Sequence, residues 1–326
     1  MGGQEARGSA VPVVGVYGRD PELLLSFIRD LIPQSHLRVC TEWNGLADIV
    51  DEVDVLLAFK FGVRPFPRDE ILGATRLQWV QLGSAGADHM TPYDPGRLVV
   101  TNASGIHGDI MSQYVIGMLL HVLWQTGRLV DQQRGRRWQL YDVPSLLGRT
   151  MGIVGAGRVG TAIATRARVF GMRVIGVRRS GDALDGFDRM YAPDSVTAVL
   201  AESDVAVLTL PLTAETRNSI GARELGALKP SAYLINVSRG GIVQEPALID
   251  LLRSGGLAGA ILDVFAEEPL PDNSPFWSLP NVIVTPHISG ELAGWRVELA
   301  RLFCANLRRW IDHEPLLNIV NPVIGY

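Results

Sequence analysis

Cysteine is scarce in this chain, and its rarity argues against two classes of protein. The 326 residues include two cysteines, Cys40 and Cys304, which are far apart and form no paired spacing. A disulfide-stabilised secreted fold needs several cysteines, and the common zinc sites need closely spaced pairs. We therefore expect neither disulfides nor a bound metal, and we expect a protein of the reducing cytoplasm.

Long apolar stretches and a large excess of one charge are also missing. The longest apolar stretch, residues 114–124, is interrupted by His121 and is too short to cross a bilayer. The first ten residues are small and polar and contain no apolar signal core. The formal net charge of −4 indicates neither a nucleic-acid nor a membrane surface. We expect a soluble protein whose partners are small molecules, with no nucleic acid and no membrane among them.

Short apolar runs alternate with amphipathic stretches along the chain, and this alternation predicts an α/β fold with doubly wound parallel sheets. The expected strands of the first part are residues 13–17, 53–59 and 77–82. The expected strands of the second part are 151–154, 173–177, 205–210, 232–236, 259–262 and 282–285. The expected helices are 21–31, one long helix over about 109–134, 157–170, and a last helix that runs from beyond Gly290 to about Trp310.

A glycine-rich turn, GAGRVG at residues 155–160, joins a predicted strand to a predicted helix. In a dinucleotide site, Gly155 allows the tight turn, Gly157 lets the backbone approach the pyrophosphate, and Gly160 lets helix and strand pack closely. The helix N-terminus favours the phosphates through its unpaired amides and its dipole. A glycine turn without a ligand is the alternative, and the strand–turn–helix–strand context disfavours it. The residues expected at the cofactor here are Gly155, Gly157, Arg158, Val159 and Gly160.

The next strand ends in two arginines, at a position where dinucleotide sites usually carry an acid. An acid at position 178 would bind a free ribose 2′-hydroxyl and repel a 2′-phosphate. Arg178 and Arg179 reverse that charge, Ser180 adds a hydroxyl donor, and a guanidinium makes charge-assisted hydrogen bonds to phosphate. We predict that NADP is the preferred cofactor. NAD stays possible, because Arg178 could instead stack on the adenine.

Charged side chains follow three further strands of the second part. Arg239, Asp263 and His287 come directly after apolar runs, with Glu267 and Glu268 close behind Asp263. Ligands bind at the carboxyl ends of strands in open α/β sheets. Reduction of a 2-oxo acid needs a cation to anchor the acid and a proton donor for its oxygen, and a carboxylate partner favours imidazolium. Spacing alone does not choose between Glu267 and Glu268.

Six motifs give the chain a resemblance to the D-isomer-specific 2-hydroxyacid dehydrogenases, and to their glyoxylate/hydroxypyruvate reductase-like members. The motifs are SAGAD (84–88), GIVGAGRVG (152–160), LPLTAET (210–216), NVSRGGIV (236–243), DVFAEEPLP (263–271) and TPHISG (285–290). The resemblance implies a flavodoxin-like substrate domain of residues 1–104 and 290–326. It also implies a Rossmann nucleotide-binding domain, residues 105–289, inserted into that domain, and a homodimer formed largely through the long helix.

The resemblance also implies roles for the charged residues. Arg239 would bind the substrate carboxylate and polarise the 2-oxo group, and His287 would be the general acid–base. Glu268 would hold the His287 ring and stabilise its protonated form, and Asp263 would bind the nicotinamide carboxamide. The resemblance selects Glu268, the glutamate that precedes Pro269.

Further contacts follow from the same resemblance. The backbone amides of Ala85 and Gly86 would hold the substrate carboxylate. Lys60, at the end of a predicted strand, either pairs with a second anionic group of the substrate or points to solvent. The other residues expected at the cofactor are Thr209, Pro211, Thr216, Val237, Ser238 and Gly290. Gln113 departs from the family, many members of which carry an acid there, and this departure puts local hinge or nucleotide contacts in question.

Together these features predict an oxidoreductase that transfers a hydride between NADP(H) and a small 2-oxo or 2-hydroxy acid, with glyoxylate or hydroxypyruvate as the expected substrate class. One alternative is a short-form D-3-phosphoglycerate dehydrogenase. The other is a non-enzymatic, nucleotide-sensing binding protein of the same fold.

Overall fold

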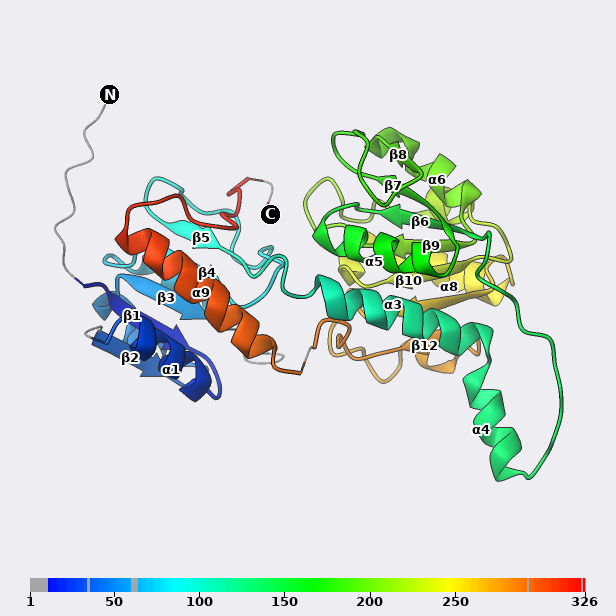
Figure 1. Cartoon of the computed structure of the whole chain (residues 1–326), viewed down its shortest axis with the longest axis horizontal. Helices are drawn as coiled ribbons and strands as arrows, with labels where there is room; N and C mark the ends of the chain where they lie inside the picture. Colours follow the sequence, from blue (N-terminus) through cyan, green and yellow to red (C-terminus); the bar gives the residue numbers. More distant parts are fainter. Residues whose placement is uncertain (1–10, 34–35, 60–63, 292, 324, 326) are drawn as a thin grey trace. The chain divides into compact units, whose positions relative to one another are not determined.

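The chain divides into two compact units. The computed structural model describes residues 11–33, 36–59, 64–291, 293–323 and 325. Unit 1 comprises Met1–Ile106 and Ala293–Tyr326, and unit 2 comprises His107–Leu292 (Figure 1). The predicted domain divisions, after residues 104 and 289, fall two and three residues before these. The substrate and nucleotide roles of the two parts stay predictions.

A five-stranded parallel sheet forms the centre of unit 1. Its strands are β1 (Val13–Tyr17), β2 (His36–Cys40), β3 (Val55–Ala58), β4 (Trp79–Leu82) and β5 (Val99–Thr101). They pair in parallel in the order β2-β1-β3-β4-β5. This is the order of flavodoxin-like sheets, so the predicted fold class of this part is confirmed.

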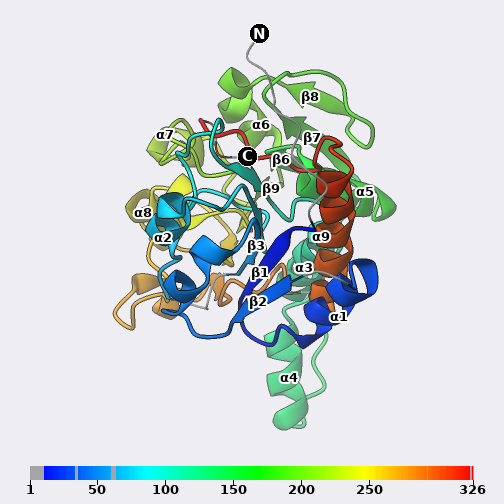
Figure 2. The same cartoon turned by 90° about the vertical axis from the view of Figure 1, so that its left-hand side faces the viewer.

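Helices cover both faces of the unit 1 sheet. The helices are α1 (Glu22–Leu31), α9 (Trp295–Ile311) and α2 (Arg68–Gly73). On one face α1 and α9 lie side by side, and Val16 packs with Ile28 and Phe303 (Figure 2). On the other face Leu56 packs with Ile71 of α2. Because the strands are buried on both sides, their sequences are apolar runs rather than alternating patterns.

A buried hydrogen-bond network ties the C-terminal segment to this sheet. The Asn306 amide on α9 donates to Gln81 Oε1 at 3.1 Å and exchanges two bonds with the backbone of Leu317. Gln81 Oε1 also accepts from the Thr101 hydroxyl, which in turn accepts from the Trp79 indole. Buried polar groups are costly unless paired, and this network pairs them. The two ends of the chain therefore build one unit.

Unit 2 contains a seven-stranded parallel sheet. Its strands are β6 (Thr150–Val154), β7 (Arg173–Val177), β8 (Arg189–Tyr191), β9 (Val205–Leu208), β10 (Tyr233–Asn236), β11 (Gly259–Leu262) and β12 (Val282–Val284). The order is β12-β11-β10-β9-β6-β7-β8. From β6 the chain adds β7 and β8 on one side, and it then crosses over to add β9 to β12 on the other side. The Rossmann fold has the same switch point, which is where a dinucleotide binds.

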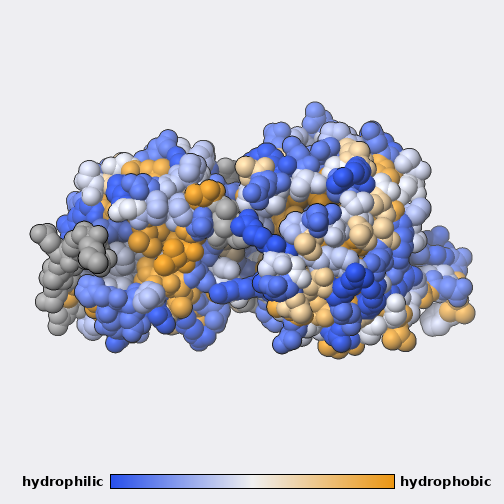
Figure 3. Space-filling model, turned by 90° about the horizontal axis from the view of Figure 1, so that it is seen from above, coloured by the Kyte–Doolittle hydropathy of each residue, from blue (hydrophilic) through white to orange (hydrophobic). Residues whose placement is uncertain are grey.

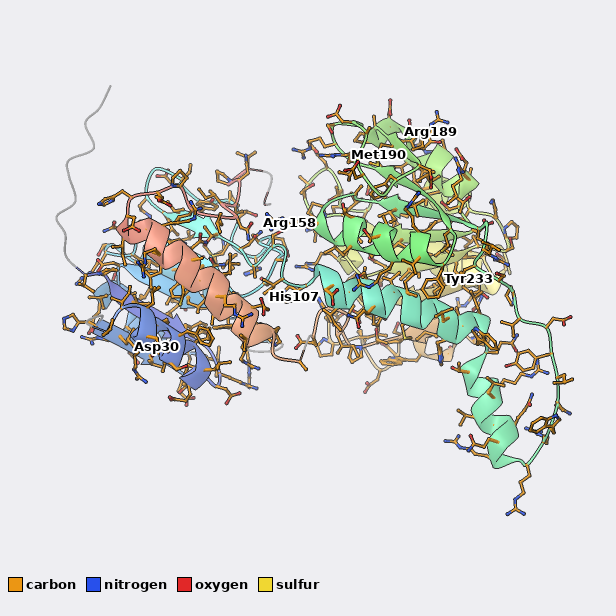
Figure 4. All side chains as sticks on the ribbon, viewed as in Figure 1. Asp30, His107, Arg158, Arg189, Met190 and Tyr233 are labelled. Atoms are coloured by element: carbon orange, nitrogen blue, oxygen red, sulfur yellow. The ribbon has the colours of Figure 1, made fainter. Side chains whose placement is uncertain are left out.

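The unit 2 sheet is also covered on both faces. The helices of one face are α3 (Gly108–Leu123) and α5 (Arg158–Val169), and those of the other are α6 (Val196–Glu202), α7 (Ala222–Leu225) and α8 (Glu245–Arg253). Helices α3 and α5 run side by side, with His107 and Arg158 at their N-terminal ends (Figure 4). They approach closely at Gly108, where an added Cβ would lie 3.5 Å from Ala162 Cβ.

The prediction of a single long helix over about residues 109–134 is wrong. The structure has two helices, α3 and α4 (Thr126–Arg134), because Gln125 takes the left-handed conformation with φ 46° and ψ 50°. The Trp124 carbonyl accepts a hydrogen bond from the Tyr141 hydroxyl at 2.6 Å, and Gly127 is a poor helix former. We call residues 124–147 the arm. Its helix α4 projects away from the sheet of unit 2 (Figure 1).

The visible surface mixes hydrophilic and apolar atoms (Figure 3). Within the residues that the structure describes, we find no helix with both the length and the apolar character needed to cross a bilayer.

Candidate active site

The carboxyl ends of the unit 2 strands meet at one edge of the sheet, and every predicted site residue of this unit lies there. The glycine turn follows β6, Arg178 follows β7, Arg239 follows β10, Asp263 follows β11, and His287 lies three residues after the end of β12. All these strands are parallel, so loops that are far apart in the sequence become neighbours.

Two glycines of the turn are required by the fold itself. Gly155 has φ +109°, and a Cβ on it would lie 2.7 Å from the Thr209 carbonyl carbon. A Cβ on Gly160 would lie 2.7 Å from the Gly155 carbonyl oxygen. The Thr209 hydroxyl donates to that same oxygen at 2.7 Å. Thr209, predicted at the cofactor, therefore also holds the glycine turn.

Gly157 is different, because nothing in the fold explains it. A Cβ added there would meet no heavy atom of the described residues within 4 Å, its chain neighbours aside, and its φ of −93° suits any residue. Gly157 is the N-cap of α5 and offers no side chain to the first turn of that helix. Open space at a helix N-terminus fits the close approach of a pyrophosphate to backbone amides. The turn therefore fits a dinucleotide.

The basic stretch after β7 lies beside an acidic residue that the sequence did not indicate. Arg178 is half-buried, and its backbone amide donates to Tyr191 of β8 at 3.2 Å. Arg179 is exposed, and its guanidinium lies 3.7 Å from the carboxylate of Glu215, in the loop after β9. Ser180 accepts a hydrogen bond from the Asp182 amide at 3.3 Å.

The imidazole of His287 is paired with Glu268. Nδ1 of His287 lies 2.8 Å from Oε2 of Glu268, while Oε1 of Glu268 accepts from the Phe265 amide at 3.0 Å. This contact uses Nδ1 and leaves Nε2 as the second ring nitrogen. Burial acts to raise the pKa of Glu268, but the hydrogen bonds from His287 and Phe265 and the charges of His287 and Arg239 hold that pKa below its usual value. Glu268 is therefore a carboxylate that holds the His287 ring by Nδ1.

Close packing brings the Arg239 loop against the Glu268 loop. A Cβ on Gly240 would lie 1.8 Å from the Phe265 carbonyl carbon, so the two backbones touch. The Arg239 guanidinium donates to the Ser238 carbonyl at 2.9 Å. Its charge reaches Glu268, since it contributes to the lowered pKa of that carboxyl. The structure thus brings Arg239, Glu268 and His287 together.

Several side chains predicted at the cofactor are engaged within their own loops. The Ser238 hydroxyl donates to Asn236 at 2.6 Å, and both Ser238 and Val237 are buried. The Thr216 hydroxyl donates to the Pro211 carbonyl at 2.6 Å. These contacts shape the loops at the carboxyl edge of the sheet.

Asp263 is fully buried and organises the loop that carries His287. Its Oδ1 accepts from the Thr285 hydroxyl at 2.5 Å and from the Ile288 amide at 2.9 Å, and its Oδ2 accepts from the Ser289 amide at 2.9 Å. These partners were not predicted from the sequence. A carboxylate has about four acceptor positions, so Oδ2 retains room for a ligand donor such as the predicted carboxamide.

Gln113 lies in a network between α3 and α5. Its amide donates to Asp109 at 2.6 Å, and Asp109 also pairs with Arg166. The hydrogen bond from Arg166 lowers the pKa of Asp109. Asp109, one helical turn before Gln113, therefore supplies an acid near the start of α3. Nearby, the Gly290 carbonyl lies 3.0 Å from Nδ1 of His107.

The substrate residues predicted in unit 1 follow its strands. Ala85 and Gly86 lie in the loop after β4, where Asn102 donates to the Ala85 carbonyl and Ser84 to the Gly86 carbonyl, both at 2.8 Å. Lys60 lies outside the described residues.

The nucleotide half of the chain matches a known family. The model of the D-isomer specific 2-hydroxyacid dehydrogenase NAD binding domain matches residues 116–289. Among curated proteins, glyoxylate/hydroxypyruvate reductase B of Pectobacterium carotovorum is 42% identical over 267 residues, which cover 79% of this chain and 83% of that protein. The glyoxylate reductase of Thermofilum pendens is 34% identical over 261 residues, or 76% of each chain.

Solved structures agree with this assignment. A D-isomer specific 2-hydroxyacid dehydrogenase of Xanthobacter autotrophicus, in complex with NADPH and MES, is 31% identical, with a TM-score of 0.84 over 97% of this chain and 100% of that one. An NADPH-dependent glyoxylate/hydroxypyruvate reductase of Sinorhizobium meliloti, in complex with NADP and sulfate, is 27% identical, with a TM-score of 0.83 over 97% of this chain and 100% of that one. The chain therefore belongs to the D-isomer-specific 2-hydroxyacid dehydrogenase family and is an NAD(P)-dependent oxidoreductase.

Proposed function

We propose that this protein is an NADP-preferring reductase of small 2-oxo acids, of the glyoxylate/hydroxypyruvate type. The observation that carries the proposal is the 2.8 Å contact between His287 and Glu268, with the charge of Arg239 beside it. Relatives named glyoxylate/hydroxypyruvate reductase support the substrate class. The turnover of NADPH and NADH with a panel of 2-oxo acids, one of them phosphorylated, tests the proposal. Fast turnover of only the phosphorylated acid would favour the 3-phosphoglycerate dehydrogenase alternative.

The cofactor would be held along the carboxyl edge of the unit 2 sheet. The opening at Gly157 fits the pyrophosphate, and Arg178, Arg179 and Ser180 present cationic and hydroxyl donors for a 2′-phosphate. Asp263 retains an acceptor position for the nicotinamide carboxamide. When bound, the cofactor supplies the hydride. Pro211, Thr216, Val237 and Ser238 shape the loops around it.

The chain's own residues supply binding and proton transfer. Arg239 binds the substrate carboxylate and polarises the 2-oxo group, because a guanidinium pairs well with carboxylates. His287 gives its Nε2 proton to the 2-oxo oxygen as negative charge develops there. Glu268 holds the ring by Nδ1 and stabilises the imidazolium before transfer. The substrate contacts predicted for Ala85, Gly86 and Lys60 of unit 1 stay predictions.

Gly157→Ala should weaken cofactor binding without lowering the stability of the fold. The added Cβ meets no described neighbour, so we expect the free energy of unfolding to change by less than about 0.5 kcal/mol, as for surface substitutions. The same Cβ would keep the pyrophosphate from the backbone and reduce NADPH affinity by about ten-fold or more, as expected for one lost charge-assisted hydrogen bond. Fluorescence titration and urea denaturation measure the two effects.

Gly117→Ala, in equally open space on α3, is the control and should leave NADPH affinity unchanged. Unchanged NADPH affinity in Gly157→Ala would remove the turn from the cofactor site.

His287→Ala should fold normally and lose turnover by a factor of roughly 10² to 10⁴, the range for a general acid–base group.

Glu268→Gln should move the pH at which the reduction rate falls, on the alkaline side, to a lower value. The lowered pKa of Glu268 keeps this carboxylate charged in the neutral range, so a wild-type imidazolium has an anionic partner there, and the amide removes that partner. A steady-state pH profile measures this shift. Near-normal turnover of His287→Ala would contradict the role of His287 as the general acid–base. Glu267→Gln is the matched control for Glu268→Gln and should keep the wild-type pH profile.

Arg178→Asp should reverse the cofactor preference. The variant loses a charge-assisted hydrogen bond of about 1.5–3 kcal/mol, which corresponds to roughly one to two decades in NADPH affinity. Aspartate can also accept hydrogen bonds from a free 2′-hydroxyl, so NADH should bind relatively better. Binding constants for both cofactors check the prediction. Tighter binding of NADH than of NADPH by the wild-type protein would contradict NADP preference.

We further propose that the protein is a homodimer assembled through the arm. Trp138 is 95% exposed and Leu140 is 90% exposed, and large exposed apolar groups that cluster mark interaction sites. Trp138→Asp should therefore convert dimers to monomers in sedimentation velocity. Val323→Asp, at a similarly exposed apolar residue of unit 1, is the control and should leave the mass unchanged. A wild-type monomer at micromolar concentration would refute the dimer.

A further inference from the structure

A chain of hydrogen-bonded side chains, two partly buried and one fully buried, runs from helix α3 to the loop that carries His287. The Tyr114 hydroxyl lies 2.7 Å from the Thr285 hydroxyl, and the Thr285 hydroxyl lies 2.5 Å from Oδ1 of Asp263. Tyr114 and Thr285 are separated by 171 residues in the sequence. The mechanism derived above uses neither of these hydroxyl groups.

Counting donors fixes the direction of this chain. Asp263 accepts on both oxygens, from the amides of Ile288 and Ser289 as well as from Thr285, which is the pattern of an ionised carboxylate. Thr285 has one hydroxyl proton and gives it to Asp263. The Thr285 oxygen is then the acceptor, and Tyr114 is the donor. Burial raises the pKa of Tyr114 to about 12, so its hydroxyl keeps this proton throughout the neutral range.

The chain ends on both sides of His287. Thr285 precedes His287 by two residues, and Ile288 and Ser289 follow it directly, so Asp263 binds a side chain before the imidazole and two backbone amides after it. His287 itself has φ +55°, a left-handed conformation that is uncommon for a non-glycine residue. The ring position that meets Glu268 depends on this backbone conformation.

We propose that Thr285 and Tyr114 are positioning residues for His287, acting through Asp263 to hold the loop that presents its imidazole to the substrate. The inference rests on the proposed role of His287 as proton donor. Within the described residues, the hydroxyls of Tyr114 and Thr285 hydrogen-bond to each other and to Asp263, and to neither the imidazole nor Glu268. Loss of either hydroxyl would loosen the loop and weaken the His287–Glu268 contact, which favours imidazolium.

The test compares Thr285→Val, which removes the hydroxyl at constant volume, with Thr285→Ser, which keeps it. We expect Thr285→Val to lower kcat for 2-oxo acid reduction by about ten-fold, since small misplacement of a catalytic group costs one to two decades. The alkaline fall of its pH profile should move to lower pH, and the Ile288 and Ser289 amides of the cofactor-free protein should exchange hydrogen faster. Thr285→Ser should match the wild type in all three measurements.

Tyr114→Phe completes the design. It should lower kcat by about three-fold in the same direction, because one neutral hydrogen bond is weaker than the charge-assisted one at Asp263. The double variant Tyr114→Phe/Thr285→Val should be no slower than Thr285→Val, because Tyr114 acts through the hydroxyl that is already gone. If Thr285→Val does not fold, Tyr114→Phe with its pH profile and amide exchange decides the question.

The proposal is overturned if Thr285→Val keeps the wild-type kcat and pH profile, or if Thr285→Ser loses as much kcat as Thr285→Val. It is also overturned if the kcat losses of Tyr114→Phe and Thr285→Val multiply in the double variant. The His287→Ala variant separates this failure from that of the proposed function. An active His287→Ala means that His287 is not the proton donor. An inactive His287→Ala with a wild-type Thr285→Val means that only the positioning role is wrong.

Discussion

Parallel hydrogen bonding in the unit 2 sheet is the constraint on which the candidate site depends. Strands β9, β6 and β7 and strands β10, β11 and β12 all run in one direction, so their carboxyl ends share an edge. A reversed strand would carry its loop to the opposite edge. The glycine turn and His287 are about 130 residues apart in the sequence, and this geometry alone makes them parts of one site.

Close backbone packing then makes this edge rigid. Gly160 lies against Gly155, and Gly240 lies against Phe265, at separations that leave no room for a side chain. Such contacts fix the loops relative to the strands and to one another. A proton donor held within a fraction of an ångström needs this kind of support, because catalytic geometry tolerates little displacement. The buried carboxylate of Asp263 adds a polar anchor to the apolar packing.

Charge is separated along the same edge. Arg178 and Arg179 follow β7, and Glu268 with its lowered pKa follows β11. The first group favours a phosphate, and the second favours an imidazolium. Glu215 partly offsets the positive charge of the two arginines, since its carboxylate lies 3.7 Å from the Arg179 guanidinium. An exposed ion pair of this kind is worth about 0–1 kcal/mol, so a bound phosphate could displace it readily.

The sequence by itself determined the fold class, most strands and the glycine turn, and it placed the two arginines and His287 after strands. These features are local, since apolar runs, glycine spacing and charge sign are written in consecutive residues. Strands β2, β5 and β8 escaped prediction, because they are short or carry polar residues. Spacing left Glu267 and Glu268 open and the resemblance selected Glu268, which the structure pairs with His287. Only the tertiary structure decided the helix break at Gln125 and the contact of Tyr114 with Thr285. Each of these depends on which side chains the packed sheet brings within hydrogen-bond distance, and that is a property of three-dimensional packing rather than of neighbouring residues.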